Sequence, residues 1–555
     1  WARFQHGLSI VEAKRWGRPL DREIKGKKGE EGTPSSQIMR YLRRVDDRTM
    51  GKLRWGMLTN GRVWRLYFQG ATSVAEDFLE IDLGKVLSIK DCDFDLLDKR
   101  PDVFTDDRAW RNHIFRLFIV LFGRSAFLAN DQGQTFHQSA LQEGKKWESK
   151  VAQSLSKKVF DEVFPSLADG IAKNDPLKPA SLTPAYLAEV RQGALFLLYR
   201  ILFVLYAEDR NLLPDEQGPY APYCLTRIRL EIADRKATGA AIPKGICTYW
   251  PRLTTIFAAI ADGNDDLGIP PYNGGLFDRA ATPILSRVQL PDNILAEVVF
   301  GLSHEPDESS RRGPKYINYR DLSVQQLGAV YEGILEYGLR ATEAGSIEID
   351  ADDQARHKSG SYYTPEALVA LIIERAVGPL VKDRLSAFRQ RAETLAKDTR
   401  PTAERMNELA HLDPALAILS LKVCDPAMGS GHFLVSLVDW LSDKVLDAKE
   451  EAIAAVTWAD YASPLAERIE TIRDRILEQA RARSWPIVEA HLDDKHVVRR
   501  MVLKRSVYGV DKNPMAVELA KVALWLHSFT VGAPLSFLDH HLRAGDSVVG
   551  AFVRP

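Results

Sequence analysis

The stretch VCDPAMGSGHFL, residues 423–434, joins an apolar strand-like segment to an apolar helix-like segment through a loop with one acid and two glycines. Outward from it, the strand-like segments LSLKVCD, SVYGVD and HHLRAGD alternate with the helix-like segments GHFLVSLVDWLSDKVLDA and NPMAVELAKVALWLHSF. Strand alternating with helix is typical of a parallel, doubly wound sheet. We therefore expect an α/β domain over residues 355–555.

Acidic side chains follow the predicted strands of this domain. In such a sheet, ligands bind beyond the carboxyl ends of the strands. The turn Gly429-Ser430-Gly431 allows a ligand to approach the backbone after the first strand, and Asp511 ends the second strand where an acid accepts hydrogen bonds from ribose hydroxyls. Asp546 follows the third strand, where it can accept from an exocyclic amine. These positions predict a nucleoside pocket.

The charge of the loop narrows the class of ligand. A dinucleotide fingerprint needs a third glycine where this chain has Leu434, and no phosphate-cradling G-x-x-x-x-G-K-[ST] loop occurs. No basic residue in the loop offsets Asp425, which disfavours a pyrophosphate. A ligand with a cationic end suits the loop better.

Four motifs together carry a family resemblance: KSGSYYTPEALV, DPAMGSGHFL, YGVDKNPMAVELAKVALWL and AGDSVVG. As a set they resemble the cofactor-binding motifs of N6-adenine DNA methyltransferases of the type IIG (Eco57I-like) restriction and modification family. That family binds S-adenosylmethionine, whose sulfonium and ammonium suit an acidic loop. The resemblance implies roles for three sets of residues. Those at the methionine end would be Tyr363, Thr364, Pro365, Asp425, Ala427, Gly429 and Gly431; Asp511 would bind the ribose, and Asp546 the adenine amine.

Two features depart from the family pattern. Asp425 and Asp511 lie 86 residues apart, whereas a simple strand-helix-strand unit places the second acid about 20 residues on, so a helical insert over about 447–500 is expected between them. The family's catalytic tetrapeptide, Asn or Asp followed by Pro-Pro and an aromatic residue, does not occur. It grips a flipped-out base, while a separate domain reads the DNA sequence. We expect both beyond residue 555.

The amino-terminal segment suggests a second active site. Glu12 and Lys14 lie two apart on a strand-like stretch and so share a face, an arrangement in which the carboxylate holds a divalent metal and the lysine orients the attacking water. Gln37 and Tyr41 follow at one-turn helical spacing, and Asn60-Gly61 indicates a hairpin.

Residues 1–70 hold sixteen Lys and Arg against seven Asp and Glu, a net charge of +9 that suits phosphate binding. With the motifs above, this module resembles the PD-(D/E)xK nucleases, with Mg²⁺ on Glu12. Residues 1–11 contain no Asp, so the upstream metal ligand either precedes Trp1 or is missing.

The middle of the chain shows helical periodicity. The apolar run 193–210 is interrupted by Arg200 and is shorter than a bilayer span, so we expect a buried core helix and no membrane partner. LYRILFVLYAEDRNLLP, YNGGLFD and LGAVYEGILE resemble the family's connector, in which Glu208 and Glu332 can equally be structural acids. The four cysteines are scattered singly, so the sequence suggests neither a disulfide framework nor a zinc site, and a reducing cytoplasm fits.

Capping residues suggest where two helices begin. We expect Ser35 or Ser36 as the N-cap of the first helix, and Thr364 as the N-cap of a helix with Pro365 in its first position.

The sequence thus predicts a multi-domain α/β protein: residues 1–100 as a nuclease-like α+β domain, 105–345 as a helical connector, and 355–555 as an incomplete Rossmann-like methyltransferase domain. The predicted function is S-adenosylmethionine-dependent N6-adenine methylation of double-stranded DNA, with an endonuclease-like domain, in prokaryotic restriction-modification or phage defence. Two alternatives stay open. In one, the amino-terminal domain only binds DNA or partner proteins of the defence system, and in the other the chain is a dinucleotide-dependent oxidoreductase.

Overall fold

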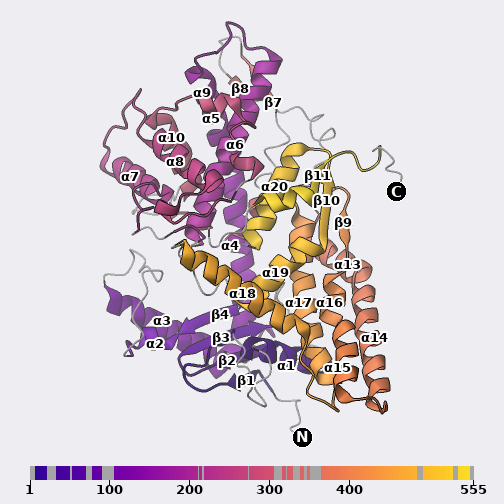
Figure 1. The fold of residues 1–555 in the computed structure, drawn as a ribbon. Coiled ribbons are helices and arrows are strands. Elements are labelled where there is room, and N and C mark those ends of the chain that lie inside the picture. The colour runs from indigo at the N-terminus through magenta and orange to yellow at the C-terminus, as the bar shows by residue number, and fades with distance from the viewer. Residues whose placement is uncertain are drawn as a thin grey trace.

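The structure is a computed structural model of residues 1–555, and it describes most of the chain. The described residues are 7–21, 33–49, 53–69, 78–89, 106–210, 212–214, 218–272, 274–305, 315–319, 322–324, 326–328, 338–342, 347–350, 364–483, 485, 492–528 and 535–549. They form a helix-rich, mixed α/β molecule in which three regions follow one another along the chain (Figure 1).

The amino-terminal module is a four-stranded sheet of order β1-β2-β3-β4, with β1 parallel to β2 and the other neighbours antiparallel. Its elements are β1 (Ile10–Ala13), α1 (Pro34–Thr49), β2 (Trp55–Thr59), β3 (Val63–Phe68), β4 (Phe78–Asp82), α2 (Leu83–Val86), α3 (Asp107–Phe122) and the short η2 (Arg124–Phe127). The hairpin predicted at Asn60-Gly61 is the β2–β3 turn, where the Asn60 side chain accepts from the backbone N–H of Val63 at 2.8 Å.

The first helix begins earlier than predicted. α1 starts at Pro34, so Ser35 lies inside its first turn and is not the N-cap. The Ser35 hydroxyl lies within hydrogen-bond distance of two acceptors, the Leu20 carbonyl at 2.9 Å and the Asp21 carboxylate at 2.5 Å. The serine therefore ties the helix to the preceding loop, and the expectation of a serine N-cap was wrong.

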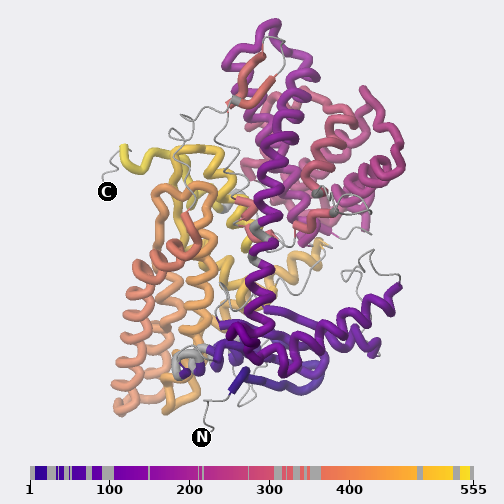
Figure 2. The backbone as a smooth tube through the Cα atoms, turned by 180° about the vertical axis from the view of Figure 1, so that it is seen from behind, coloured from indigo at the N-terminus to yellow at the C-terminus, as the bar shows by residue number. Residues whose placement is uncertain are grey.

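The described part of the connector is mostly helical and also contains two short pairs of antiparallel strands. Its elements are α4 (Phe136–Lys158), η3 (Val159–Val163), α5 (Phe164–Asn174), α6 (Pro184–Asp209), α7 (Leu225–Thr238), α8 (Tyr249–Asp262), η4 (Asp265–Leu267), η5 (Gly275–Phe277), α9 (Pro283–Arg287), α10 (Asp292–Ser303), β5 (His304–Glu305), β6 (Lys315–Tyr316), β7 (Gly338–Ala341) and β8 (Ile347–Asp350). Figure 2 shows α4, η3 and α5 as one long helical column that rises from the amino-terminal module into the connector.

The apolar run 193–210 is the core helix that its sequence predicts. α6 is the one described helix long and apolar enough to cross a membrane, but 89% of its most apolar window is buried inside the protein. Arg200, which interrupts the run, is buried too, and its guanidinium donates to the carbonyls of Leu276 at 2.7 Å and Asp278 at 3.1 Å. The arginine is tolerated in the core because backbone oxygens accept its hydrogen bonds.

The carboxyl-terminal region contains a three-stranded parallel sheet of order β11-β10-β9. Its elements are α13 (Glu366–Ala376), α14 (Gly378–Ala396), α15 (Thr402–His411), α16 (Pro414–Leu419), β9 (Val423–Asp425), α17 (His432–Ala455), α18 (Pro464–Ala482), α19 (Asp494–Arg505), β10 (Val507–Asp511), α20 (Pro514–His527), η8 (Leu535–His540) and β11 (Leu542–Ala544). The three strands and the helices between them lie where the sequence predicts them.

The segment between the first two strands is helical, as expected. α17 continues to Ala455, and α18 and α19 follow before β10 begins. Asp439 of α17 accepts from Arg499 of α19 and lies 2.7 Å from the ring nitrogen Nε2 of His527 in α20. The insert is therefore bound into the same layer of helices that covers the sheet.

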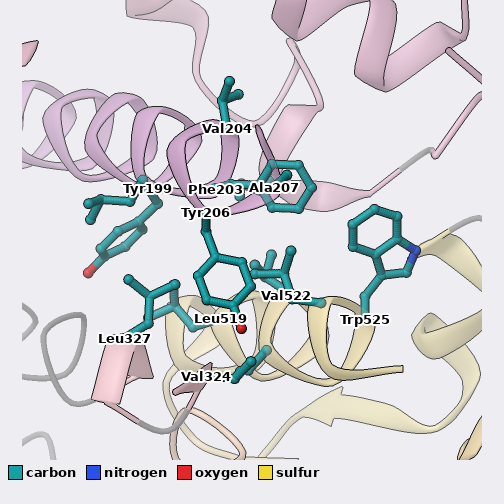
Figure 3. Close-up of a cluster of buried hydrophobic side chains, with 14 of the residues drawn as sticks. Tyr199, Phe203, Val204, Tyr206, Ala207, Val324, Leu327, Leu519, Val522 and Trp525 are labelled. Carbon is teal, nitrogen blue, oxygen red and sulfur yellow. The ribbon is translucent and has the colours of Figure 1, made fainter. Parts of the chain in front are cut away.

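The main hydrophobic core is shared between two regions of the chain. Buried residues of α6 and of α20 belong to one continuous cluster, with Phe203 and Trp525 among them (Figure 3). The amino-terminal module has separate small clusters, and in one of them Trp55 packs against Phe127 of η2 and against His137 at the start of α4.

Candidate functional site

Three carboxylates gather at one edge of the carboxyl-terminal sheet. Asp425 is the last residue of β9, Asp511 is the last residue of β10, and Asp546 lies two residues beyond the end of β11. The strands are parallel and adjacent, so their carboxyl ends share an edge. The backbone N–H of Gly545 donates to the carbonyl of Asp511 at 2.9 Å, which holds the third strand end beside the second.

The glycine loop takes a conformation that favours glycine. Gly429 and Gly431 have φ angles of 54° and 86° in the left-handed region, and Gly431 is the N-cap of α17. The N–H of Gly429 donates to Asp511 at 2.9 Å, and the N–H of Met428 donates to the carbonyl of Val510 at 3.0 Å. Asp511 therefore holds the loop against the second strand, a contact that the sequence alone does not reveal.

The electrostatics of the loop favour a cation. Burial, and secondly the charge of Asp511, raise the pKa of Asp425 above its usual range, although the N–H of Ala427 donates to it at 3.0 Å. Two nearby acids without a basic residue in the loop create a negative potential, which a bound cation would relieve. The carboxylates can also accept hydrogen bonds from hydroxyl or amine groups.

Asp546 differs from the other two acids in its partners, and 35% of its side chain is exposed. Its Oδ1 accepts from the N–H groups of Val548 and Val549, both at 3.0 Å, and its Oδ2 lies 3.5 Å from the Lys512 ammonium. These backbone donors, and secondarily Lys512, lower the pKa of Asp546. It is a fixed, ionised acceptor at the rim of the site.

The Y-Y-T-P segment is only partly described. Tyr363 lies outside the described residues, and Thr364 and Pro365 are exposed ahead of α13. α13 begins at Glu366, with Pro365 as its N-cap and no side-chain cap, so the prediction of Thr364 as the N-cap was wrong by one position. α13 packs against α17, and Glu374 accepts from the indole of Trp440 at 3.2 Å.

The predicted residues of the amino-terminal module form a cluster. The Lys14 ammonium lies 2.7 Å from a carboxylate oxygen of Glu12 and donates to the side-chain carbonyl of Gln37, also at 2.7 Å. Gln37 is buried, and Tyr41 is half-buried one turn later on α1. Within the described ranges, no three His, Cys, Asp or Glu side chains come together as a metal site. Glu12 is the one acid among the four residues predicted for this site.

Part of the basic surplus of this module is neutralised internally. Arg62 forms an ion pair with Asp82 at 2.8 Å, and Arg65 contacts both Asp21 and Glu80 at 2.6 Å. The net charge of residues 1–70 therefore overstates the positive surface of the described module.

The connector acid Glu208 is structural. It is buried at the end of α6 and accepts from the Tyr220 hydroxyl at 2.5 Å and from the backbone N–H of Thr226 at 2.7 Å. Burial raises its pKa in spite of these bonds. Glu332 lies outside the described residues.

Comparison with known proteins supports the resemblance drawn from the motifs. No family model matches the chain. Over 394 residues it is 23% identical to a protein of Methanocaldococcus jannaschii described as "Putative type II restriction enzyme and methyltransferase RM.MjaORFECS2P", and the match covers 65% of this chain and 27% of the relative. The chain therefore spans about a quarter of the length of the curated relative that it matches. It is similar to restriction-modification enzymes.

A solved structure of the type IIL restriction-modification enzyme MmeI in complex with DNA also matches, with 15% identity and a TM-score of 0.34. The match covers 69% of this chain and 40% of that chain. A TM-score this low carries no argument about the fold.

Proposed function

We propose that the chain is the cofactor-binding part of an S-adenosylmethionine-dependent DNA methyltransferase that modifies adenine N6 in restriction-modification or phage defence. One observation carries this proposal: Asp425, Asp511 and Asp546 lie at the carboxyl ends of three adjacent parallel strands. Their order, β11-β10-β9, is that of the third, second and first strands in one common doubly wound sheet. The similarity to a type II restriction enzyme and methyltransferase supports the same reaction class.

The residues of the site fit this cofactor. The paired acids Asp425 and Asp511 suit its cationic methionine end and its ribose hydroxyls, while Asp546 provides a fixed acceptor for an adenine amine. When bound, the cofactor supplies an activated methyl group. The glycine loop and the strand ends would hold it, and catalysis would come mainly from positioning its methyl group for in-line attack by the adenine N6.

The dinucleotide alternative is disfavoured by the helix that follows the loop. Leu434, at the position of the third fingerprint glycine, is fully buried in α17. Here Gly509 of β10 lets the strand pack closely against the loop and α17, since a Cβ at this position would lie 2.3 Å from the Met428 sulfur and 2.9 Å from Leu434 Cδ1. The side chains of Met428 and Leu434 thus fill the space beneath the loop, unlike the glycine packing of a pyrophosphate-binding turn.

The role of the amino-terminal module has two candidates. The cluster of Glu12, Lys14 and Gln37 supports a Mg²⁺-dependent endonuclease, since a carboxylate and a lysine lie side by side on one face. Among the described residues, Glu12 is not part of a group of three potential metal ligands, which leaves a second candidate function, a module that only binds DNA or a partner of the defence system.

The test uses the full-length protein, duplex DNA, tritiated S-adenosylmethionine and Mg²⁺, with methyl incorporation and strand cleavage scored together. We expect Asp511→Ala to abolish methylation and leave any cleavage, and Glu12→Ala to abolish cleavage and leave methylation. Methylation without cleavage in the wild-type protein would assign the amino-terminal module a binding role. No methylation on DNA of varied sequence would refute the proposed activity.

A further inference from the structure

The connector lies directly against α20, the helix that follows Asp511. The Trp525 ring of α20 is buried and packs against Phe203 of α6, with ring centroids 5.3 Å apart (Figure 3). It also contacts the Tyr272 ring, with centroids 4.7 Å apart. η5 approaches the same helix so closely that a Cβ on Gly275 would lie 2.1 Å from a carboxylate oxygen of Glu518. The contacts join residues about 240 to 320 positions apart in sequence.

α20 in turn touches the glycine loop. A Cβ on Gly431 would lie 3.0 Å from Cβ and 3.1 Å from Cα of Ala520, so this loop residue rests on the helix with no space between them. The helix is therefore held from one side by connector aromatics and supports the loop with another part of its surface.

A second part of the connector reaches the loop itself. Val324 and Leu327 are buried in the core beside Tyr206 and Leu519, as Figure 3 shows. One residue further on, a Cβ on Gly328 would lie 3.2 Å from Ser430 Oγ and 3.9 Å from Ser430 Cβ. Ser430 stands between the two loop glycines and is itself buried. The absence of a side chain at Gly328 lets connector and loop meet.

We propose that the connector positions the glycine loop, and that the absence of a side chain at Gly328 determines the position of Ser430. This inference rests on the proposed function, because the loop's importance follows from its role in cofactor binding. Gly328 touches no reacting atom. It acts through Ser430 and the neighbouring Gly429, whose N–H donates a hydrogen bond to Asp511.

The decisive comparison is a double-variant cycle. In Gly328→Ala, the new methyl group forces Ser430 Oγ to shift by a few tenths of an ångström. In Ser430→Ala that oxygen is gone, and the remaining Cβ at 3.9 Å is an ordinary contact. Gly144→Ala, on an exposed face of α4 where a Cβ meets nothing within 4 Å, is the matched control.

S-adenosylmethionine binding is measured by calorimetry on the full chain. We expect Gly328→Ala to weaken binding about fivefold or more, by analogy with overpacked cores, and Gly144→Ala to leave it unchanged. The Gly328→Ala, Ser430→Ala double variant should bind as Ser430→Ala alone. Equal affinities of Gly328→Ala and wild type, or an equal loss in both backgrounds, would overturn the inference.

Amide hydrogen exchange of residues 428–431 in the absence of cofactor separates this inference from the proposed function. We expect faster exchange at the Gly429 amide in Gly328→Ala, restored by adding Ser430→Ala. If the wild-type protein did not bind S-adenosylmethionine, the proposed function would fail, while this exchange pattern would still decide whether the connector positions the loop. Unchanged exchange would then refute it.

Discussion

At the scale of single residues, the charge of Asp511 acts on Asp425 because the two acids end neighbouring strands at one edge of the sheet. The strand ends predicted from the sequence place both acids on that edge. The sequence could not show that Asp511 accepts from the Gly429 N–H, because the two residues are 82 positions apart and the bond depends on the path of the loop. Their roles toward a cofactor stay predictions.

Asp425 should lower the stability of the fold while it strengthens cofactor binding. Its raised pKa means that the folded protein holds this proton more tightly than the unfolded chain, so stability falls as the pH rises from the usual aspartate range through the raised pKa. Asp425→Asn has no carboxyl group to titrate and so does not lose this stability. Denaturant unfolding should therefore show the free energy of unfolding of the variant rising relative to that of the wild type over this pH range.

The same substitution should weaken S-adenosylmethionine binding near neutral pH, because it removes a negative charge beside a cation. Calorimetry at several pH values measures this, and wild-type affinity should increase as the pH rises through the raised pKa of Asp425. Unchanged affinity in Asp425→Asn would show that Asp425 does not face the cationic end.

At the scale of elements, periodicity and turn residues gave the right order of strands and helices. The Asn60-Gly61 hairpin and the parallel strands β9, β10 and β11 are confirmed. The exact starts of α1 at Pro34 and of α13 at Glu366 were missed, because several neighbouring Ser, Thr and Pro residues suit the first positions of a helix. Ser35 instead bonds to a loop that is distant in sequence.

The left-handed N-cap of α17 should be sensitive to substitution. Gly431→Ala is expected to cost at least about 1–2 kcal/mol in the free energy of unfolding, since an L-residue is strained at positive φ and Ala520 leaves no space. Gly144→Ala should instead be neutral or stabilising by up to about 1 kcal/mol, as expected in a helix interior. Chemical denaturation compares the two, and equal effects would contradict the loop geometry.

At the scale of the whole molecule, the connector and the carboxyl-terminal region share one core. Helical periodicity predicted that α6 is buried but not what it is buried against, since a fully apolar helix carries no preferred face. The contacts of Phe203 and Tyr272 with Trp525 join parts of the chain that the sequence divides into separate regions.

This shared core predicts a joint unfolding transition. Trp525→Ala should destabilise the protein by about 3–5 kcal/mol, the usual cost of removing a large buried aromatic side chain. Trp147→Ala, at a 42% exposed position on α4, should cost much less. Hydrogen exchange under mild denaturant should show α6 and α20 losing protection together in Trp525→Ala. Loss of protection in α20 alone would mean that the two regions fold independently.

The central claim is that the three carboxylates at the sheet edge bind S-adenosylmethionine. Calorimetric titration of the cofactor into the wild-type chain, Asp511→Ala and the surface control Asp262→Ala, whose carboxylate is 72% exposed, tests it most directly. We predict saturable one-site binding to the wild type and to Asp262→Ala, and at least tenfold weaker binding to Asp511→Ala, a change of about 1.4 kcal/mol or more. Binding to all three with the same affinity, or to none of them, would contradict the account.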